Sequence, residues 1–322
     1  MLGIDLPIIQ GAIGAAAVPA LVAAVSNAGG LGTLVLTGLG AERTRAAIRQ
    51  TRQRTKRPFI GNFILDFDIE AELAVALDEG IPLISLFWGD PAPFAARIHA
   101  AGAQMMVTVG GVDEGKRARD AGADILVAQG WEAGGHVRGT VSTLALIPAV
   151  VDIAGDVPVV AAGGIADGRG LVAVLALGAQ AAWIGTRFLA ATEADVHPEY
   201  RAQVIRAGTG DTVYSRLYDG GWPDAPARVV RTRAVADWEA AGCPKSGFRA
   251  GEADVIGRTG AQPVYRYAAD TPVGATTGDV GSMSLWAGQG VGLVRRIQPA
   301  AVIVAEIAAQ ADALLRTMCG QG

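Results

Sequence analysis

The chain has 322 residues, of which 51% are hydrophobic, 6% are aromatic and 44 are glycines, and its formal net charge is −4 at pH 7. The length suits either two average domains or one larger barrel, and this apolar, glycine-rich composition favours a single core of parallel strands and closely packed helices. The small net charge and the lack of a basic tail exclude nucleic acid as the expected partner. We therefore expect an enzyme that acts on a small molecule.

The N-terminal segment and the cysteines bear on the expected compartment. Asp5, Pro7 and Gln10 interrupt the first apolar residues and no basic segment precedes them, so we expect no signal peptide. No uninterrupted apolar run reaches the ~18 residues that suggest a membrane span. Cys243 and Cys319 are too few for a disulfide framework and lack metal-ligand spacing. These features predict a cytoplasmic protein with no metal site and no membrane partner.

Short apolar runs that suit buried strands recur up to residue 189. They begin near Ile8, Leu31, Phe59, Leu83, Gln104, Ile125, Val157 and Ala181. Segments with helical spacing lie between them, at residues 19–28, 41–53, 69–79, 91–101, 114–121, 143–154 and 168–177. The steps of 21 to 32 residues leave room for the crossover that parallel strands require. Eight alternating units predict an α/β fold of the (β/α)8 TIM barrel type, with an open doubly wound sheet as the alternative.

The alternation stops after Leu189. Residues 190–283 are rich in Gly, Pro, Asp and Arg, and only short pieces at 213–217 and 234–242 suggest local strand or helix. An insertion of this size in a barrel is expected over its C-terminal face. We therefore expect a barrel of residues 1–189 and 284–322, closed by a helix at 298–318, and a lid or substrate subdomain at 190–283.

Two consecutive strand-like runs end in loops with very small side chains. Residues 157–162 lead into Gly163 and Gly164, with Asp167 as a helix cap, and residues 181–184 lead into Gly185 and Thr186. Glycines let backbone N–H groups approach an anion, and phosphate sites of TIM barrels lie after strands seven and eight. The pattern predicts a phosphate site, while simple tight turns remain the plain alternative.

A histidine stands in a glycine-rich loop after the sixth strand-like run. His99 falls inside an expected helix and His197 precedes a proline in the insert, whereas His136 ends the segment QGWEAGGH at residues 129–136. An imidazole there has room to reach a ligand, and its usual pKa suits proton abstraction at neutral pH. A catalytic base is one interpretation, and a surface histidine without a ligand is the other.

Seven segments together resemble the nitronate monooxygenase family, formerly called 2-nitropropane dioxygenases. They are PIIQGAIG (7–14), AVSNAGGLG (24–32), GNF (61–63), QGWEAGGH (129–136), AAGGIADG (161–168), IGTRF (184–188) and LWAGQGVG (285–292). The resemblance covers nearly the whole chain and is weakest over residues 190–283. It implies an FMN-dependent TIM barrel in which His136 is the catalytic base, with Gly134 and Gly135 leaving space for the substrate.

The resemblance also implies a set of cofactor contacts. The implied residues are Gly163, Gly164, Gly185 and Thr186 at the phosphate, Gln129 and Gly134 at the flavin, Asn62 facing the ring, Gln10, Gly11 and Ala12 under the ring, and Gln289 completing the site. Many relatives carry Pro-Met after the first glycine, where this chain has Ala12 and Ile13. This difference from the family pattern concerns the contacts at the edge of the flavin. It does not affect the expected phosphate site or His136.

Three functions fit this sequence. The first is FMN-dependent oxidation of alkyl nitronates, such as propionate 3-nitronate, or of nitroalkanes with molecular oxygen. The second is an NAD(P)H-dependent flavin reductase of the quinone reductase or enoyl-acyl-carrier-protein reductase II type. The third is a barrel that binds a phosphorylated ligand without redox chemistry. The sequence leaves a homo-oligomer open.

Overall fold

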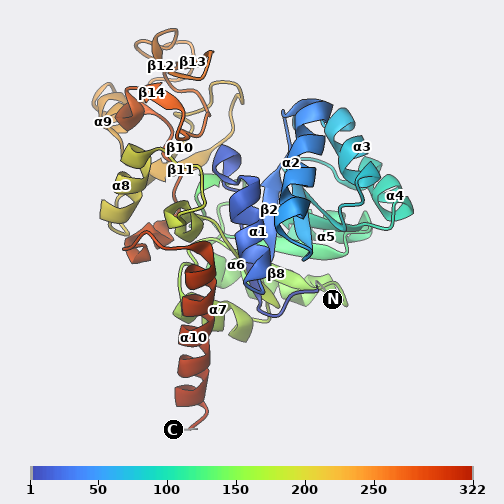
Figure 1. Cartoon of the computed structure of the whole chain (residues 1–322). Helices are drawn as coiled ribbons and strands as arrows, with labels where there is room; N and C mark the ends of the chain where they lie inside the picture. Colours follow the sequence, from blue (N-terminus) through green and yellow to red (C-terminus); the bar gives the residue numbers. More distant parts are fainter. Residues whose placement is uncertain (1–2, 321–322) are drawn as a thin grey trace.

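The computed structural model describes residues 3–320, and its centre is a parallel barrel (Figure 1). Its strands are β1 (Ile8–Gln10), β2 (Gly32–Val35), β3 (Phe59–Ile64), β4 (Leu83–Phe87), β5 (Gln104–Val109), β6 (Ile125–Gln129), β8 (Val159–Ala162) and β9 (Ala181–Ile184). They pair in the order β1-β9-β8-β6-β5-β4-β3-β2, and a parallel bridge between Ile9 and Leu31 joins the two ends. The predicted TIM barrel is therefore confirmed, and the open-sheet alternative is wrong.

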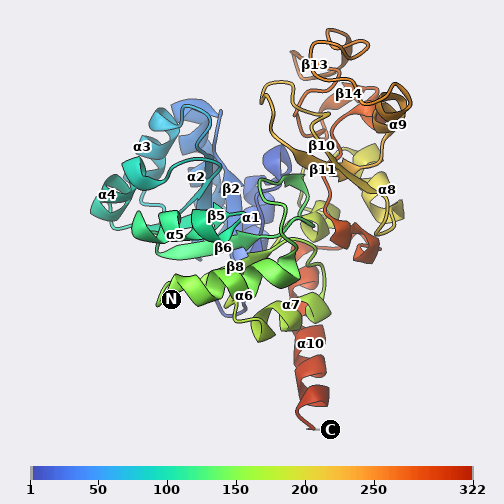
Figure 2. The same ribbon diagram turned by 180° about the vertical axis from the view of Figure 1, so that it is seen from behind.

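Helices follow the strands and cover the outside of the barrel (Figures 1 and 2). They are α1 (Pro19–Asn27), α2 (Gly40–Arg54), α3 (Glu70–Asp78), α4 (Ala92–Ala100), α5 (Val112–Asp120), α6 (Thr143–Ala154), α7 (Gly168–Ala176) and α10 (Ala300–Met318). Asp167 caps α7 as predicted, because its carboxylate accepts the N–H groups of Arg169 at 3.0 Å and Gly170 at 3.3 Å. The last helix begins two residues later than predicted, since Pro299 holds the N-cap in an extended conformation.

The barrel interior changes from apolar to polar along the strands. Its lower part is filled by Ile9, Leu31, Ile60, Leu83, Met106, Ile125, Val127, Val160, Ala162 and Ala181. Side chains alternate between the two faces of a strand, so Asn62 shares the inner face with Ile60, and Gln129 shares it with Val127. The apolar layers form a floor, and the amides stand above it at the C-terminal ends of the strands.

The inserted segment forms a lobe at the end of the molecule opposite the C-terminus of α10 (Figures 1 and 2). Its elements are α8 (Pro198–Arg206), β10 (Thr212–Ser215), β11 (Ala227–Val230), α9 (Arg233–Ala240), β12 (Val255–Thr259), β13 (Gln262–Tyr265) and β14 (Thr276–Gly278). The short helices η1 (Gly14–Ala16), η2 (Thr186–Ala190), η3 (Val280–Ser282) and η4 (Gln289–Leu293) lie in the connecting loops. Both pieces expected in the insert are present, the first as a strand and the second as a helix.

Two small sheets organise this lobe. The first has the order β10-β11-β7, in which β7 (Gly135–His136) belongs to the loop after β6 of the barrel. Ala227 pairs with His136 and Arg228 with Gly135, both antiparallel. The second sheet has the order β13-β12-β14 and lies at the tip. The histidine loop is thus a strand of the insert's own sheet.

Among residues 3–320, no helix is both long enough and apolar enough to span a membrane.

Candidate active site

A cavity of about 530 Å³ opens at the C-terminal ends of the barrel strands. Loops after β1, β3, β6, β8 and β9 contribute to its wall, together with segments of the insert. The expected site residues that line it are Gly11, Ala12, Asn62, Gln129, Gly134, His136, Gly163, Gly164, Gly185 and Thr186. The barrel therefore gathers residues that lie up to 175 positions apart into one site.

Two expected cofactor residues do not line this cavity. Ile9 fills the barrel interior, and side chains alternate along a strand, so Gln10 lies on the other face of β1. Its amide oxygen accepts the N–H of Thr33 at 3.0 Å, and its amide N–H donates to the Gly11 carbonyl. Gln289 lies between two lining glycines, and its N–H donates to the Glu132 carbonyl at 2.9 Å. Gln10 stabilises the junction of β1 and β2, and Gln289 fastens its segment to the histidine loop.

The loops after β8 and β9 present backbone donors to the cavity. Within residues 3–320, the N–H groups of Gly163, Gly164 and Gly185 have no acceptor in the chain. Gly163 and Gly164 have φ values of +110° and +71°, and a Cβ on Gly163 would lie 2.8 Å from Thr143 Oγ1. Only glycine fits there without strain. Free N–H groups converging on one place suit a phosphate, so these loops fit the terminal phosphate of a flavin.

Side chains fasten this cradle to the histidine loop. The Glu132 carboxylate accepts the N–H of Thr143 at 2.8 Å. The single hydroxyl proton of Thr143 is shared between this carboxylate, at 2.9 Å, and the Gly163 carbonyl, at 3.1 Å. The N–H of Gly288 donates to Thr186 Oγ1 at 2.9 Å. The acid of the histidine loop therefore caps α6 and ties the loops after β6 and β8 together. Sequence reasoning gave Glu132 no such role.

His136 faces the cavity from the edge of the small sheet. Its Nε2 is buried and has no hydrogen-bond partner among the described residues, and burial lowers the pKa of the imidazole from 6.5 to about 4. The nearby Gln129 amide donates to the His136 carbonyl at 3.2 Å, while its own oxygen has no donor. Burial therefore favours the neutral imidazole at pH 7, the form in which one ring nitrogen can accept a proton.

Three tryptophans surround the imidazole, and sequence reasoning assigned none of them to the site. The ring centroids of Trp222, Trp286 and Trp88 lie 4.1, 5.1 and 6.1 Å from that of His136. Trp286 falls within the quoted LWAGQGVG segment, which could have pointed to it. Trp88 has a positive φ of 64°, which is strained for an aromatic residue. No sequence pattern marked Trp222 or Trp88.

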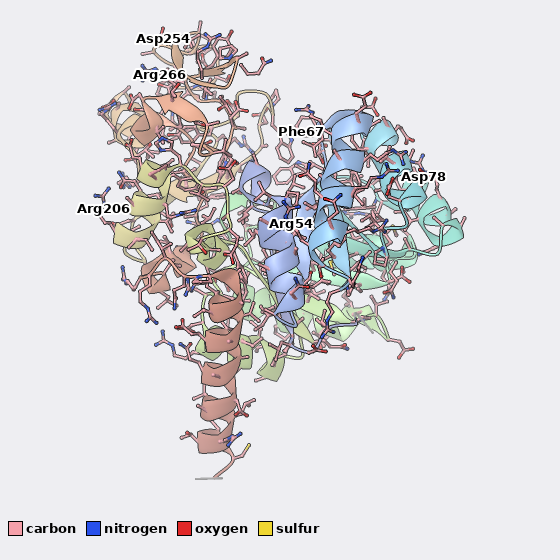
Figure 3. All side chains as sticks on the ribbon, viewed as in Figure 1. Arg54, Phe67, Asp78, Arg206, Asp254 and Arg266 are labelled. Atoms are coloured by element: carbon pink, nitrogen blue, oxygen red, sulfur yellow. The ribbon has the colours of Figure 1, made fainter. Side chains whose placement is uncertain are left out.

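Trp222 also joins the insert to the barrel. Its indole N–H donates to Asp66 Oδ2 at 2.9 Å, and its ring meets Phe67 edge-on at 5.2 Å. Asp66 and Phe67 follow β3, and Figure 3 places Phe67 at the side of the barrel that faces the inserted lobe. This contact brings Trp222 of the insert and Phe67 of the barrel together at the cavity wall.

Arg228 supports the histidine loop from behind. It is 2% exposed, donates to the Trp131 carbonyl at 2.9 Å, and stacks on the Trp131 ring with 4.3 Å between the guanidinium carbon and the ring centroid. Burial lowers its pKa, and the negative charge of Glu132 opposes that effect. A buried cation held by stacking and a carbonyl fixes the backbone that leads to His136.

A closed parallel barrel whose last two strands lead into glycine loops, with a histidine lining the same cavity, is typical of a cofactor-dependent barrel enzyme. The family model described as nitronate monooxygenase matches residues 1–73 and 66–310. The chain belongs to the nitronate monooxygenase family, and it is a flavin-dependent oxidoreductase.

Curated relatives and solved structures agree with this placement. A nitronate monooxygenase of Paraburkholderia phytofirmans is 32% identical, over 95% of this chain and 92% of its own. An octahydro-indene-carboxyl-CoA dehydrogenase of Rhodococcus jostii is 37% identical, over 75% of this chain and 67% of its own. FabK from Thermotoga maritima has a TM-score of 0.83 at 32% identity, covering 99% and 96% of the two chains. A nitroalkane oxidase of Streptomyces ansochromogenes has a TM-score of 0.79 at 30% identity, covering 98% of each.

Proposed function

We propose that this protein oxidises alkyl nitronates or nitroalkanes with molecular oxygen, with FMN as its cofactor. The observation that carries this proposal is the neutral, unpartnered Nε2 of His136 on the cavity wall. The carbon next to a nitro group becomes electron-rich only after it loses a proton. A neutral imidazole can accept that proton, whereas a protonated one cannot.

FMN is the form of flavin that this site favours. The free N–H groups of Gly163, Gly164 and Gly185 suit one terminal phosphate, and no dinucleotide-binding GxGxxG segment follows β1. When bound, the flavin would accept two electrons from the substrate and pass them to oxygen. Asn62 and Gln129 stand on the inner face of the barrel, where they would contact the ring.

The chain itself positions the substrate and excludes water. Trp222 and Trp286 lie next to His136, and Gly134 lets the histidine loop pack against the Gly288 backbone, since a Cβ there would lie 2.3 Å from the N atom of Gly288. Burial among these aromatic rings disfavours the charged form of the imidazole. We also propose that residues 190–283 act as the substrate subdomain, because Trp222 and Asp270 bring that segment into the cavity lining.

Steady-state kinetics of His136→Asn test this function. On a neutral nitroalkane, loss of a positioned base should lower turnover ~10²- to 10⁴-fold. On the preformed nitronate of the same compound, which has already lost its proton, turnover should fall much less. Wild type and variant are compared at equal flavin content. Equal retention of activity on both substrates would remove His136 from the mechanism.

A flavin reductase that uses NAD(P)H is the second candidate. The similarity to FabK and to the CoA dehydrogenase favours it, because both point to redox partners other than a nitro compound. The two functions separate in an anaerobic experiment on the purified yellow protein. Bleaching of the flavin by a nitronate alone supports the oxidase, and bleaching by NADH or NADPH supports the reductase. The non-redox phosphate-binding barrel is excluded by the family.

A further inference from the structure

The cavity wall carries an unusual distribution of charge. Of the residues within 3–320 that line it, none is lysine or arginine, and the one carboxylate belongs to Asp270. The uncharged polar residues of the wall are Thr37, Asn62, Thr108, Gln129, Thr186, Tyr200 and Thr271. His136 is the one further titratable group that could become positive, and its imidazole is neutral at pH 7.

Three arginines lie on or next to the small sheet that carries His136. Arg138 forms an ion pair with Glu114, with 3.3 Å between Nε and Oε1, and Arg216 Nη1 lies 3.7 Å from Asp224 Oδ1. Arg228 is buried, and its guanidinium lies over the Trp131 ring. None of the three lines the cavity.

Asp270 is an exposed residue that lines the cavity. Partial desolvation raises the pKa of its carboxyl group, and no neighbouring cation offsets that effect. Its own carbonyl accepts the Ser284 hydroxyl at 2.5 Å, and the hydroxyl of Thr271 packs against Gly14, where a Cβ would be 2.4 Å away. These contacts hold the segment that carries Asp270 against the loop after β1, at the wall of the cavity.

We propose that this cavity selects nitro substrates with an uncharged tail over those that carry a carboxylate, and that Asp270 sets this preference. The inference rests on the proposed nitronate-oxidising function and narrows its substrate class. An alkyl nitronate has one negative charge, at the reacting group next to His136. Propionate 3-nitronate adds a carboxylate that would meet Asp270 without any cation to neutralise it. A bound flavin phosphate would add further negative charge to the same space.

The kinetic test uses holoenzyme at pH 8 with two nitronates, those of 3-nitropropionate and 1-nitrobutane. Two unit charges about 4 Å apart in well-solvated surroundings alter affinity by roughly five- to tenfold. We expect kcat/KM of wild type to favour the uncharged tail by at least that factor, mainly through KM. Asp270→Asn should shrink the ratio by about the same factor. Asp254→Asn, at the tip of the insert (Figure 3), removes a carboxylate that is remote from the cavity and should leave the ratio unchanged.

A binding measurement keeps the test independent of turnover. Benzamide and benzoate have the same shape and differ in charge, and quenching of the cavity tryptophans reports their dissociation constants. We expect benzamide to bind more tightly in wild type, and Asp270→Asn to bring the two constants together. A wild-type preference for the carboxylate ligand, or a ratio that Asp270→Asn does not change, overturns the inference. If no nitronate is oxidised while the binding ratio responds to Asp270 alone, the proposed function fails and the charge selection stands.

Discussion

The low pKa of His136 makes protein stability depend on pH in a defined direction. Burial lowers this pKa to about 4, against about 6.5 in the unfolded chain. Between these values the unfolded chain binds a proton that the folded protein does not, so stability falls as the pH drops through 6.5 toward 4. From pH 7.5 to pH 5.0 the loss attributable to this one group is roughly 2 kcal/mol. Below pH 4 both states are protonated and the loss levels off.

Replacing the imidazole by a group that does not titrate isolates this effect. Between pH 7.5 and pH 5.0, the free energy of unfolding of His136→Gln should fall by about 2 kcal/mol less than that of wild type. Urea unfolding of the flavin-free proteins at several pH values gives the difference directly. The chain has only three histidines, so an NMR titration compared with the variant identifies the His136 signal. A midpoint above 6, or the same pH dependence in both proteins, would refute the account of a desolvated neutral base.

Two further predictions concern the cradle and the support of the histidine loop. Gly164→Leu should abolish flavin retention during purification, because φ at this position is +71° and a side chain would enter the space of the free N–H groups. Normal flavin content in the purified variant would contradict the phosphate cradle. Arg228→Met should lower the free energy of unfolding by about 1.5–3 kcal/mol through loss of the charged hydrogen bond to Trp131. The control variant Arg231→Met removes an exposed ion pair with Glu239 and should lower the free energy of unfolding by less than about 1 kcal/mol. If thermal unfolding shows the same loss of stability in both variants, Arg228 has no special role.

Periodicity was sufficient to predict the barrel, for a physical reason. Strands buried on both faces read as continuous apolar runs, and regular crossover lengths leave few other topologies. The helix boundaries differ by one or two residues, and prolines stand at the changed starts of α4 and α10. The run expected to start at Val157 becomes a strand at Val159, since Pro158 has no N–H for the sheet.

The cavity wall was predictable from local sequence alone where it is built from glycine loops, whereas Asn62 and Gln129 were expected through the family resemblance. Gly163, Gly164 and Gly185 have a local signature, because the backbone itself makes the site. Trp222 and Asp270 have none, since their place in the wall is set by how the insert folds back on the barrel. Their partners are far away in the chain, as the bond from Trp222 to Asp66 across 156 residues shows. Such pairings depend on tertiary structure, which residue spacing does not encode.

The pairing of β7 with β11 couples the insert mechanically to the proposed base. A lobe that swung open as a rigid cover would pull on the strand that carries His136, or would break its two backbone pairings first. Ligand exchange therefore calls for movement of individual loops around Trp222 and Asp66, while the lobe stays in place. The same coupling bears on engineering. A chimera that takes residues 190–283 from a relative also receives a foreign strand against its own histidine, so substrate range and base geometry would change together.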